Sequence, residues 1–255
     1  SGLRIIKAIL EGERDANNLA LLCDTKILSK KKDSIIESLK GNYKEEYLFM
    51  LKQAYVAYMF YQGQIHDCDL EIEKILNRMN KGKKVIKSGV AKPSRHNQPD
   101  IKGLHEKLVT LHEGKNPTVL PGISDMTILK LSGELGCDYT KWPSEKHFTS
   151  WMGLSPIKHQ SGKTNKNKRR KVNSKAGQIF KESAMSIANS KYLSLKGFYY
   201  RIKSKHGAKA AIKATARKLA VLYYRYMTQG IDYVEIGLSE YEKIYKEQAI
   251  QALTR

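Results

Sequence analysis

The chain has 255 residues, of which 41% are hydrophobic, and a formal net charge of +21. This apolar content is enough for a folded core and excludes a wholly disordered tail. No run of about 18 apolar residues and no signal-peptide pattern is present, so we expect a cytoplasmic protein without a membrane partner. A charge this large makes nucleic acid the first partner class to consider.

The positive charge is confined to the second part of the chain. Residues 1–80 carry 12 Lys and Arg against 12 Asp and Glu, so the whole excess lies in residues 81–255. Between Lys158 and Arg225 there are 19 basic residues and a single acid, Glu182. A folded surface this basic favours a polyanionic partner, and we expect DNA.

The first forty residues have a helical apolar spacing. It predicts a short helix pair over residues 3–23, interrupted at Gly12. Lys30–Lys32 is expected as a solvated turn, and Asp33 as the N-cap of a helix over Ser34–Leu39.

Three widely separated cysteines stand in no CxxC spacing, which predicts reduced thiols in the core. They are Cys23, Cys68 and Cys137. His66 and Asp69 would share one face of a helix, but two ligands are too few for a metal site, and none is predicted.

From Tyr43 to Met79 the residues of one stripe follow one another at alternating steps of three and four. This heptad spacing is typical of a coiled coil or a long antiparallel hairpin, and the alternative is one long helix packed on its own domain. We expect residues 43–79 to mediate self-association into a homodimer or a higher oligomer. The seam consists of Leu48, Leu51, Tyr55, Tyr58, Gln62, Ile65, Asp69, Ile72, Leu76 and Met79.

The rest of the chain predicts more helices, and the fold class is mainly α. Residues 80–101 are rich in Pro, Gly and basic residues and predict a basic flexible linker between a helical dimerisation region, 1–79, and a C-terminal domain, 102–255. Phe148, Trp151 and Met152 are expected to give one short helix a buried face. The predicted helices are Lys102–Leu111, Met126–Leu135, Ser144–Trp151, Ser174–Asn189, Leu195–Lys203, Ala208–Met227 and Ser239–Leu253.

The stretch Leu120–Ser124, which reads Leu-Pro-Gly-Ile-Ser, predicts a tight turn between helices. Ser124 or Asp125 would cap the next helix, and the free amides there could hold a phosphate, as in a helix-hairpin-helix element. The alternative is that Pro-Gly only joins two packed helices. On the first interpretation the DNA-binding residues are Gly122, Ile123 and Ser124.

Residues 153–174 lack helical periodicity and predict a basic loop or hairpin against something anionic. Ser161 lies there, and the surrounding positive charge would favour its alkoxide and a phosphoryl transition state. From the spacing alone, however, a serine in a basic loop is far more often a phosphate hydrogen-bond donor than a nucleophile. The predicted DNA-binding residues of this region and the helices beyond are Gly162, Lys163, Lys166, Lys168, Arg169, Arg170, Lys171, Lys175 and Arg217.

Other catalytic schemes fit the sequence less well. Two-metal phosphoryl transfer needs several converging carboxylates, which are sparse after residue 80. A tyrosine nucleophile is conceivable at Tyr223, Tyr224 or Tyr226, beside Arg217 and Arg225. The alternative for these tyrosines is a half-buried place on a helix.

An ordered set of motifs resembles the insertion-sequence transposases of the one-ten and eleven-eleven group, to which the pilin-gene invertase also belongs. These enzymes join a RuvC-like nuclease domain to a serine-bearing C-terminal domain. The resemblance spans nearly the whole chain. Its motifs are Gly2-Leu-Arg-Ile-Ile-Lys-Ala-Ile-Leu-Glu-Gly-Glu-Arg-Asp15, Leu51-Lys-Gln53, Leu120-Pro-Gly-Ile123, Glu134-Leu-Gly136, Trp151-Met-Gly-Leu-Ser-Pro156, Gln160-Ser-Gly-Lys163 and Ala216-Arg-Lys-Leu219.

The resemblance implies a DNA recombinase that is guided by a structured RNA and dimerises through its coiled coil. It also implies that four acids of the nuclease domain bind Mg²⁺ and that a serine, by motif Ser161, attacks the DNA phosphate. Relatives often read Ser-Gly-Gly-Lys, whereas this chain has Ser161-Gly162-Lys163.

The printed sequence starts where that nuclease domain would already have ended. We therefore expect a fragment that lacks the domain and its metal, has no cofactor of its own and is inactive alone. The rival hypothesis is a non-catalytic helix-hairpin-helix module that binds nucleic acid.

Overall fold

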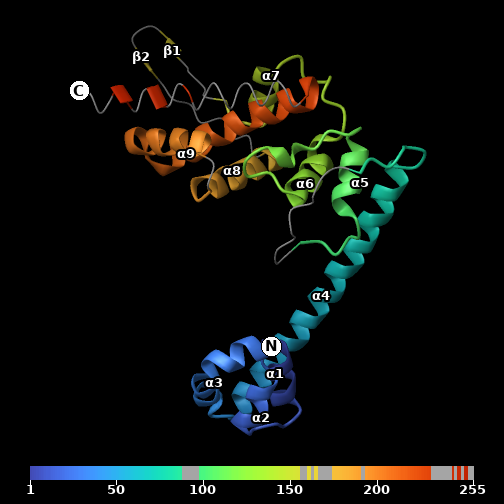
Figure 1. Ribbon diagram of the computed structural model, residues 1–255, viewed down its shortest axis with the longest axis vertical. Helices are drawn as coiled ribbons and strands as arrows, with labels where there is room; N and C mark the ends of the chain where they lie inside the picture. Colours follow the sequence, from blue (N-terminus) through green and yellow to red (C-terminus); the bar gives the residue numbers. More distant parts are fainter. Residues whose placement is uncertain are drawn as a thin grey trace. The chain divides into compact units, whose positions relative to one another are not determined.

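The computed structural model confirms a mainly α-helical chain (Figure 1). It divides into two compact units, Ser1–Glu71 and Ile72–Arg255. Among the residues described, no helix is long and apolar enough to span a membrane. The described residues are 1–87, 98–155, 160–161, 164–165, 174–190, 193–230, 243, 246, 247, 250 and 251.

The first unit begins with the predicted helix pair. Helix α1 spans Gly2–Leu10 and α2 spans Ala16–Leu21, and the Asp15 side chain caps α2 by accepting from the Asn17 amide at 2.9 Å. Cys23, just after α2, is partly buried. The division of residues 3–23 into two short helices is therefore confirmed.

The solvated turn predicted at Lys30–Lys32 is confirmed as an exposed kink at Lys31, and the helix α3, Thr25–Leu39, continues on both sides of it. Only Lys31 leaves the helical conformation, with φ −141° and ψ 27°. Lysine is a good helix former, and no Gly or Pro interrupts the helix here. Asp33 consequently lies within α3 and is not its N-cap.

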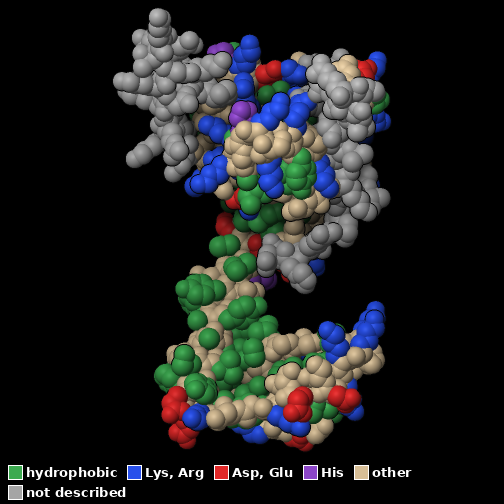
Figure 2. Space-filling model, turned by 90° about the vertical axis from the view of Figure 1, so that its left-hand side faces the viewer, with side chains coloured by type: hydrophobic (Ala, Val, Ile, Leu, Met, Phe, Trp, Pro, Cys, Tyr) green, Lys and Arg blue, Asp and Glu red, His purple; other side chains and the backbone are tan. Residues whose placement is uncertain are grey.

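Helix α4 is continuous from Glu45 to Met79, which confirms a long helix. Of the predicted seam, Asp69 and Leu76 are buried, and Leu48, Leu51, Tyr55 and Ile72 are half-buried. Leu76 and Ile72 pack in the core of the second unit, as the alternative of a helix packed on its own domain predicts for this end. Large apolar side chains elsewhere on its first part are exposed, and Figure 2 shows them along the helix. Self-association through this helix stays a prediction.

The prediction of core thiols is wrong for Cys68 on α4 and for Cys137, since both are exposed. Cys68 stands between Asp67 and Asp69, and Cys137 follows the end of a helix. A cysteine's small apolar side chain does not by itself decide burial, because its neighbours along the chain also determine which face turns inward.

The described start of the predicted linker contacts helix α5, Leu104–Leu111. The Asn80 side-chain amide donates to the Lys107 carbonyl oxygen at 2.8 Å, and the Lys83 amine donates to that of Leu111 at 3.0 Å. The predicted flexibility of residues 80–101 and the predicted domain boundaries stay predictions.

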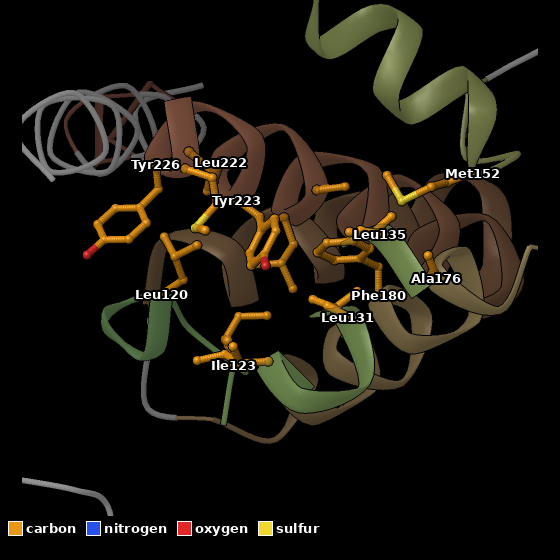
Figure 3. Close-up of a cluster of buried hydrophobic side chains, with 14 of the residues drawn as sticks. Leu120, Ile123, Leu131, Leu135, Met152, Ala176, Phe180, Leu222, Tyr223 and Tyr226 are labelled. Carbon is orange, nitrogen blue, oxygen red and sulfur yellow. The ribbon is translucent and has the colours of Figure 1, made fainter. Parts of the chain in front are cut away.

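The second unit has one main hydrophobic core, built by α5 and four later helices (Figure 3). Helix α8 packs against both α6 and α9, and α7 packs on α9. Figure 3 shows Leu131 and Leu135 of α6, Phe180 of α8 and Tyr223 of α9 meeting in this core. The elements are η1, Pro117–Val119, α6, Asp125–Leu135, α7, Glu145–Trp151, α8, Lys175–Ala188, and α9, Leu193–Gln229.

Serines define the starts of three of these helices. Ser124, Ser144 and Ser174 each accept a hydrogen bond from a backbone amide in the first turn of α6, α7 and α8, respectively. Such side chains satisfy amides that the helix leaves unpaired. The predicted starts of these helices are confirmed within one or two residues.

Trp151 is an exception to the predicted face of α7. Phe148 and Met152 are buried as expected, but Trp151 is 49% exposed. Its ring lies edge-on against Trp142, with 5.5 Å between centroids. Because Trp142 comes from the loop before α7, it takes the buried position that periodicity assigned to Trp151.

Helix α9 consists of two arms, which correspond to the predicted helices Leu195–Lys203 and Ala208–Met227. They meet at Gly207, whose φ of 80° and ψ of 170° end the first arm. Most of the helix predicted over Ser239–Leu253 lies outside the described residues, and those described there are helical.

Candidate nucleic-acid interface

Ser161 lies in a short β-hairpin. Strand β1, Gln160–Ser161, pairs antiparallel with β2, Thr164–Asn165, and Ser161 is opposite Thr164. The hairpin alternative of the predicted basic segment is thus confirmed. The other site residues predicted in this segment lie outside the described residues, namely Gly162, Lys163, Lys166, Lys168, Arg169, Arg170 and Lys171.

The residues that flank the hairpin segment, at the end of α7 and the start of α8, lie in contact with each other. A Cβ atom at Gly177, in the first turn of α8, would overlap the carbonyl oxygen of Met152 just after α7. Met152 and Ala176 are both buried at this junction (Figure 3). Only glycine allows backbones to approach this closely. The end of α7 and the start of α8 therefore form a fixed base for the segment.

The Leu-Pro-Gly-Ile turn packs against α8. A Cβ atom at Gly122 would lie 2.8 Å from the Ser183 carbonyl oxygen, and the Ile123 side chain is buried in the core. The Ile123 amide donates to the Leu120 carbonyl oxygen at 3.4 Å. These contacts fit the interpretation that Pro-Gly joins packed elements, and the element before the turn is the 3₁₀ helix η1. Phosphate binding at Gly122, Ile123 and Ser124 stays a prediction.

A carboxylate already stands at the start of α6. The Asp125 side chain is 2.7 Å from His105 Nδ1, and this pair links α6 to α5. His105 Nε2 is 3.4 Å from the side-chain nitrogen Nδ2 of Asn116. A negative charge in the first turn of a helix is stabilised by the helix dipole. Asp125 therefore already supplies the negative charge that this helix start favours.

The three candidate nucleophiles, Tyr223, Tyr224 and Tyr226, lie in the core of the second unit or pack against it. The hydroxyls of Tyr223 and Tyr139 are 2.8 Å apart, and burial raises the pKa of both. Tyr224 donates to the Trp142 carbonyl oxygen at 2.6 Å, and the Tyr226 hydroxyl accepts from the Asn116 amide at 2.8 Å. Tyr223 and Tyr226 are more deeply buried than the half-buried places predicted for them. These positions disfavour a phenolate nucleophile.

Basic residues are abundant on α9, which has nine Lys and Arg and no Asp or Glu. Arg225 forms an ion pair with Glu145 of α7, while Arg217 is half-buried on the second arm. Lys175, at the start of α8, is exposed, and its amine is 3.5 Å from a carboxylate oxygen of Glu134. Figure 2 shows Lys and Arg side chains gathered on one face of this unit.

Sequence reasoning missed the aromatic rings among these cations. Lys203 lies over the ring of Tyr200, and Arg201 and Lys218 both lie over Phe198. The available signal was the run Phe198-Tyr-Tyr-Arg-Ile-Lys203, in which rings and cations lie three apart on a helix.

The described residues contain no group of three or more His, Cys, Asp or Glu side chains placed to hold a metal ion. The pair His66 and Asp69 accordingly gains no third ligand among them.

These observations place Ser161 in a β-hairpin of the basic segment that connects α7 to α8 in the second unit. Residues 118–200 match the Transposase IS116/IS110/IS902 family. The match covers about a third of the chain, from η1 to the first arm of α9, and includes Ser161. It supports a transposase role and DNA as a partner. No curated protein and no solved structure matches the chain significantly.

Proposed function

We propose that this chain is the C-terminal part of a DNA transposase in which Ser161 is the nucleophile. The observation that carries the proposal is the match over residues 118–200, because it spans the hairpin with Ser161 and the helices that hold its base. The serine chemistry is our proposal.

In the proposed step the Ser161 hydroxyl oxygen attacks a phosphorus atom of the DNA backbone. A new bond forms between serine oxygen and phosphorus, the bond to one deoxyribose oxygen breaks, and that oxygen takes a proton as it leaves. Basic side chains near the hairpin would stabilise the charge on the phosphoryl oxygens in the transition state. Lys163, two residues after Ser161, is the nearest candidate along the chain.

The fixed base of the segment supports this role. A nucleophile gains most when its approach is set in advance, because the entropy cost of orientation is then met during folding. Gly177 against Met152 provides such a fixed base, and the β1–β2 pairing sets the register of Ser161. We propose that a RuvC-like nuclease domain acts with this serine and supplies the Mg²⁺ site, and that a structured guide RNA selects the target.

We also propose that the chain self-associates through residues 43–79. Helix α4 exposes large apolar side chains on the predicted seam, among them Tyr58 and Ile65, with nothing apolar in their own unit to cover them. A helix that is apolar on several sides is normally covered by other helices. A second copy of the chain would supply such a helix.

A purely binding role is the alternative function. It is favoured by the nine Lys and Arg of α9, which would hold a nucleic-acid backbone without chemistry. In that case Ser161 would only donate a hydrogen bond to phosphate. The two functions differ in one measurable respect, which is a covalent bond between protein and DNA.

The test is Ser161→Ala in the chain joined to a RuvC-like nuclease domain. We expect strand transfer and the denaturation-resistant protein–DNA adduct to disappear, since the attacking oxygen is gone. Affinity for DNA should change by at most about tenfold, because one neutral hydrogen bond contributes only about 0.5–1.5 kcal/mol. The measurement is gel analysis of the adduct followed by mapping of the linked residue.

Thr164→Ala is the matched control, because Thr164 stands opposite Ser161 in the hairpin and also loses a hydroxyl. It should retain the adduct. Recombination that persists with alanine at position 161, or an adduct that maps to Tyr223, Tyr224 or Tyr226, would overturn the assignment.

A further inference from the structure

The two arms of α9 fold back on each other at Gly207. Tyr199 of the first arm is buried with Ala211 of the second, and the amine of Lys218 lies 5.7 Å from the ring centroid of Phe198. The positive φ of Gly207 permits this reversal, which residues with a Cβ atom rarely adopt. We call the two arms and Gly207 the α9 elbow.

Tyr200 presents a ring to solvent from a fixed position on the elbow. It is 46% exposed. Its ring stands edge-on to buried Tyr199, with 5.2 Å between centroids and an interplanar angle of 84°. Its hydroxyl is 3.5 Å from the Ala188 carbonyl oxygen of α8. One side of the ring is thus held by the protein while the remainder is open.

Cations flank the rings of the elbow on two sides of its first arm. The amine of Lys203 lies 5.5 Å from the centroid of Tyr200, and the guanidinium of Arg201 lies 5.7 Å from that of Phe198. Further exposed cations surround the turn, and α9 contains no acid to neutralise them. Those exposed cations are Lys205, Lys209 and Lys213.

This combination fits one kind of partner. Cations without acids select a polyanion, and nucleic acid is the polyanion that the proposed function already requires. The backbone of a duplex needs only the cations, because the faces of paired bases are covered by their neighbours. An exposed ring beside a cation adds affinity when a base is unpaired and can stack on it.

We propose that the α9 elbow binds unpaired nucleotides, with Tyr200 stacking on a base and Lys203 holding an adjacent phosphate. The inference rests on the proposed nucleic-acid binding and goes beyond it by assigning the strand type and the residues. A single-stranded loop of RNA and a separated DNA strand offer the same chemistry to this surface.

The experiment measures binding by fluorescence anisotropy with three labelled probes. They are a single strand of DNA of about 12 nucleotides, the RNA of the same sequence, and the corresponding DNA duplex. Tyr200→Ala should weaken binding to the single strands by about fivefold to a hundredfold, which corresponds to the loss of one stacked base. Duplex binding should change by less than about twofold, because no base face is available there.

Two variants separate stacking from other causes. Tyr200→Phe keeps the ring and should bind single strands like the unmodified chain. Trp151→Ala removes a ring of similar exposure, 49% against 46%, from α7, and should leave single-strand affinity unchanged. Circular dichroism would verify that all three variants stay folded.

Several outcomes would overturn the inference. If Tyr200→Ala binds single strands normally, or loses single strands and duplex equally, Tyr200 does not stack on a base. If Trp151→Ala weakens single-strand binding and Tyr200→Ala does not, the stacking surface belongs to α7. If the unmodified chain binds none of the probes, the proposed function fails as well. A loss of affinity confined to RNA or to DNA would support the proposed site and show which of the two nucleic acids it binds.

Discussion

The two longest helices of this chain, α4 and α9, are nearly equal in length and opposite in surface chemistry. Helix α4 has 35 residues with six acids and three bases, and it exposes large apolar rings. Helix α9 has 37 residues with nine bases and no acid, and it directs most of its large apolar side chains into the cores of its own unit.

This difference separates two kinds of partner that helical periodicity alone does not separate. Exposed apolar area is stabilised by removal from water, which favours another protein surface. Exposed cations remain hydrated when they bind a polyanion. The release of the polyanion's counterions provides the free energy of binding, which favours nucleic acid as the partner. We therefore expect changes in α4 to affect assembly and changes in α9 to affect nucleic-acid binding.

The largest expected effect is on assembly. Tyr58 and Ile65 lie on the predicted seam of α4 and are 42% and 52% exposed. Changing both to serine removes two buried side chains from each partner of a dimer, roughly 6 kcal/mol in total. The dissociation constant should then rise by about four powers of ten, so light scattering would show monomers in the micromolar range.

Phe49 and Phe60 provide the matched control for the seam. They are 64% and 61% exposed and lie on the side of α4 opposite Tyr58. In a two-stranded coiled coil, serine at both positions should leave the dimer intact. Loss of assembly from this pair but not from the seam would contradict the heptad assignment. Loss from both pairs would indicate a bundle of more than two helices.

The second effect is on salt dependence and concerns the basic segments. Replacing four cations of the Ser161 segment by glutamine should flatten the plot of log affinity for duplex DNA against log salt. The slope should fall by roughly three to four, because each lost phosphate contact contributes about 0.9. Between about 50 and 200 mM salt, this amounts to roughly a hundredfold difference in affinity. The four residues are Lys168, Arg169, Arg170 and Lys171.

Two further sets of four lysines locate the footprint. Neutralising the elbow set should lower the single-strand slope by roughly three, at about 0.7 for each contact. Neutralising the α3 set removes the same charge from the first unit and should change neither slope. A change from the α3 set as large as the others would mean that net charge, and not a particular surface, governs binding. The elbow set is Lys203, Lys205, Lys209 and Lys213, and the α3 set is Lys26, Lys30, Lys31 and Lys32.

The sequence was sufficient for features that local chemistry determines. Ser124, Ser144 and Ser174 mark helix starts because a serine cap acts on amides only two or three residues away. Gly207 ends a helix because its own backbone conformation does so. These signals lie within a few residues of the structure that they specify, so no knowledge of the packing was needed.

Features decided by distant contacts were not predictable in the same way. Trp151 has the right spacing for burial, but Trp142 occupies that place. Gly177 gave a usable signal, since a glycine in the first turns of a predicted helix often marks a close approach, yet the contact with Met152 depends on how α7 and α8 meet. Ser161 was predicted as a site residue from the resemblance to a family. The exposure of the Tyr200 ring could be recognised only from the structure.

The smallest effect concerns the end of α5 and the residues after it. Hydrogen bonds connect this segment to α9 and to the residues that follow α4. His112, just after α5, is buried, and its Nε2 atom is 2.8 Å from the hydroxyl oxygen of Ser132. Its Nδ1 atom has no hydrogen-bond partner among the described residues. Lys83, four residues after the end of α4, donates to the Leu111 carbonyl oxygen, and Lys115 donates to that of Met227 on α9.

Burial, with the charges of Lys83 and Lys115, lowers the pKa of His112 to about 4. Below the ordinary histidine pKa of about 6.5 the unfolded chain binds a proton that the folded chain does not bind. The stability associated with neutral His112 is therefore complete near pH 7 and is lost as the pH falls toward 4. Between about pH 7 and pH 5 the free energy of unfolding should decrease by about 2 kcal/mol from this group.

Urea unfolding of the unmodified chain and of His112→Gln at the two pH values measures this contribution. The variant has no titrating ring at position 112, so its stability should depend less on pH by about the same 2 kcal/mol. An equal pH dependence in both proteins would show that His112 titrates normally in the folded state.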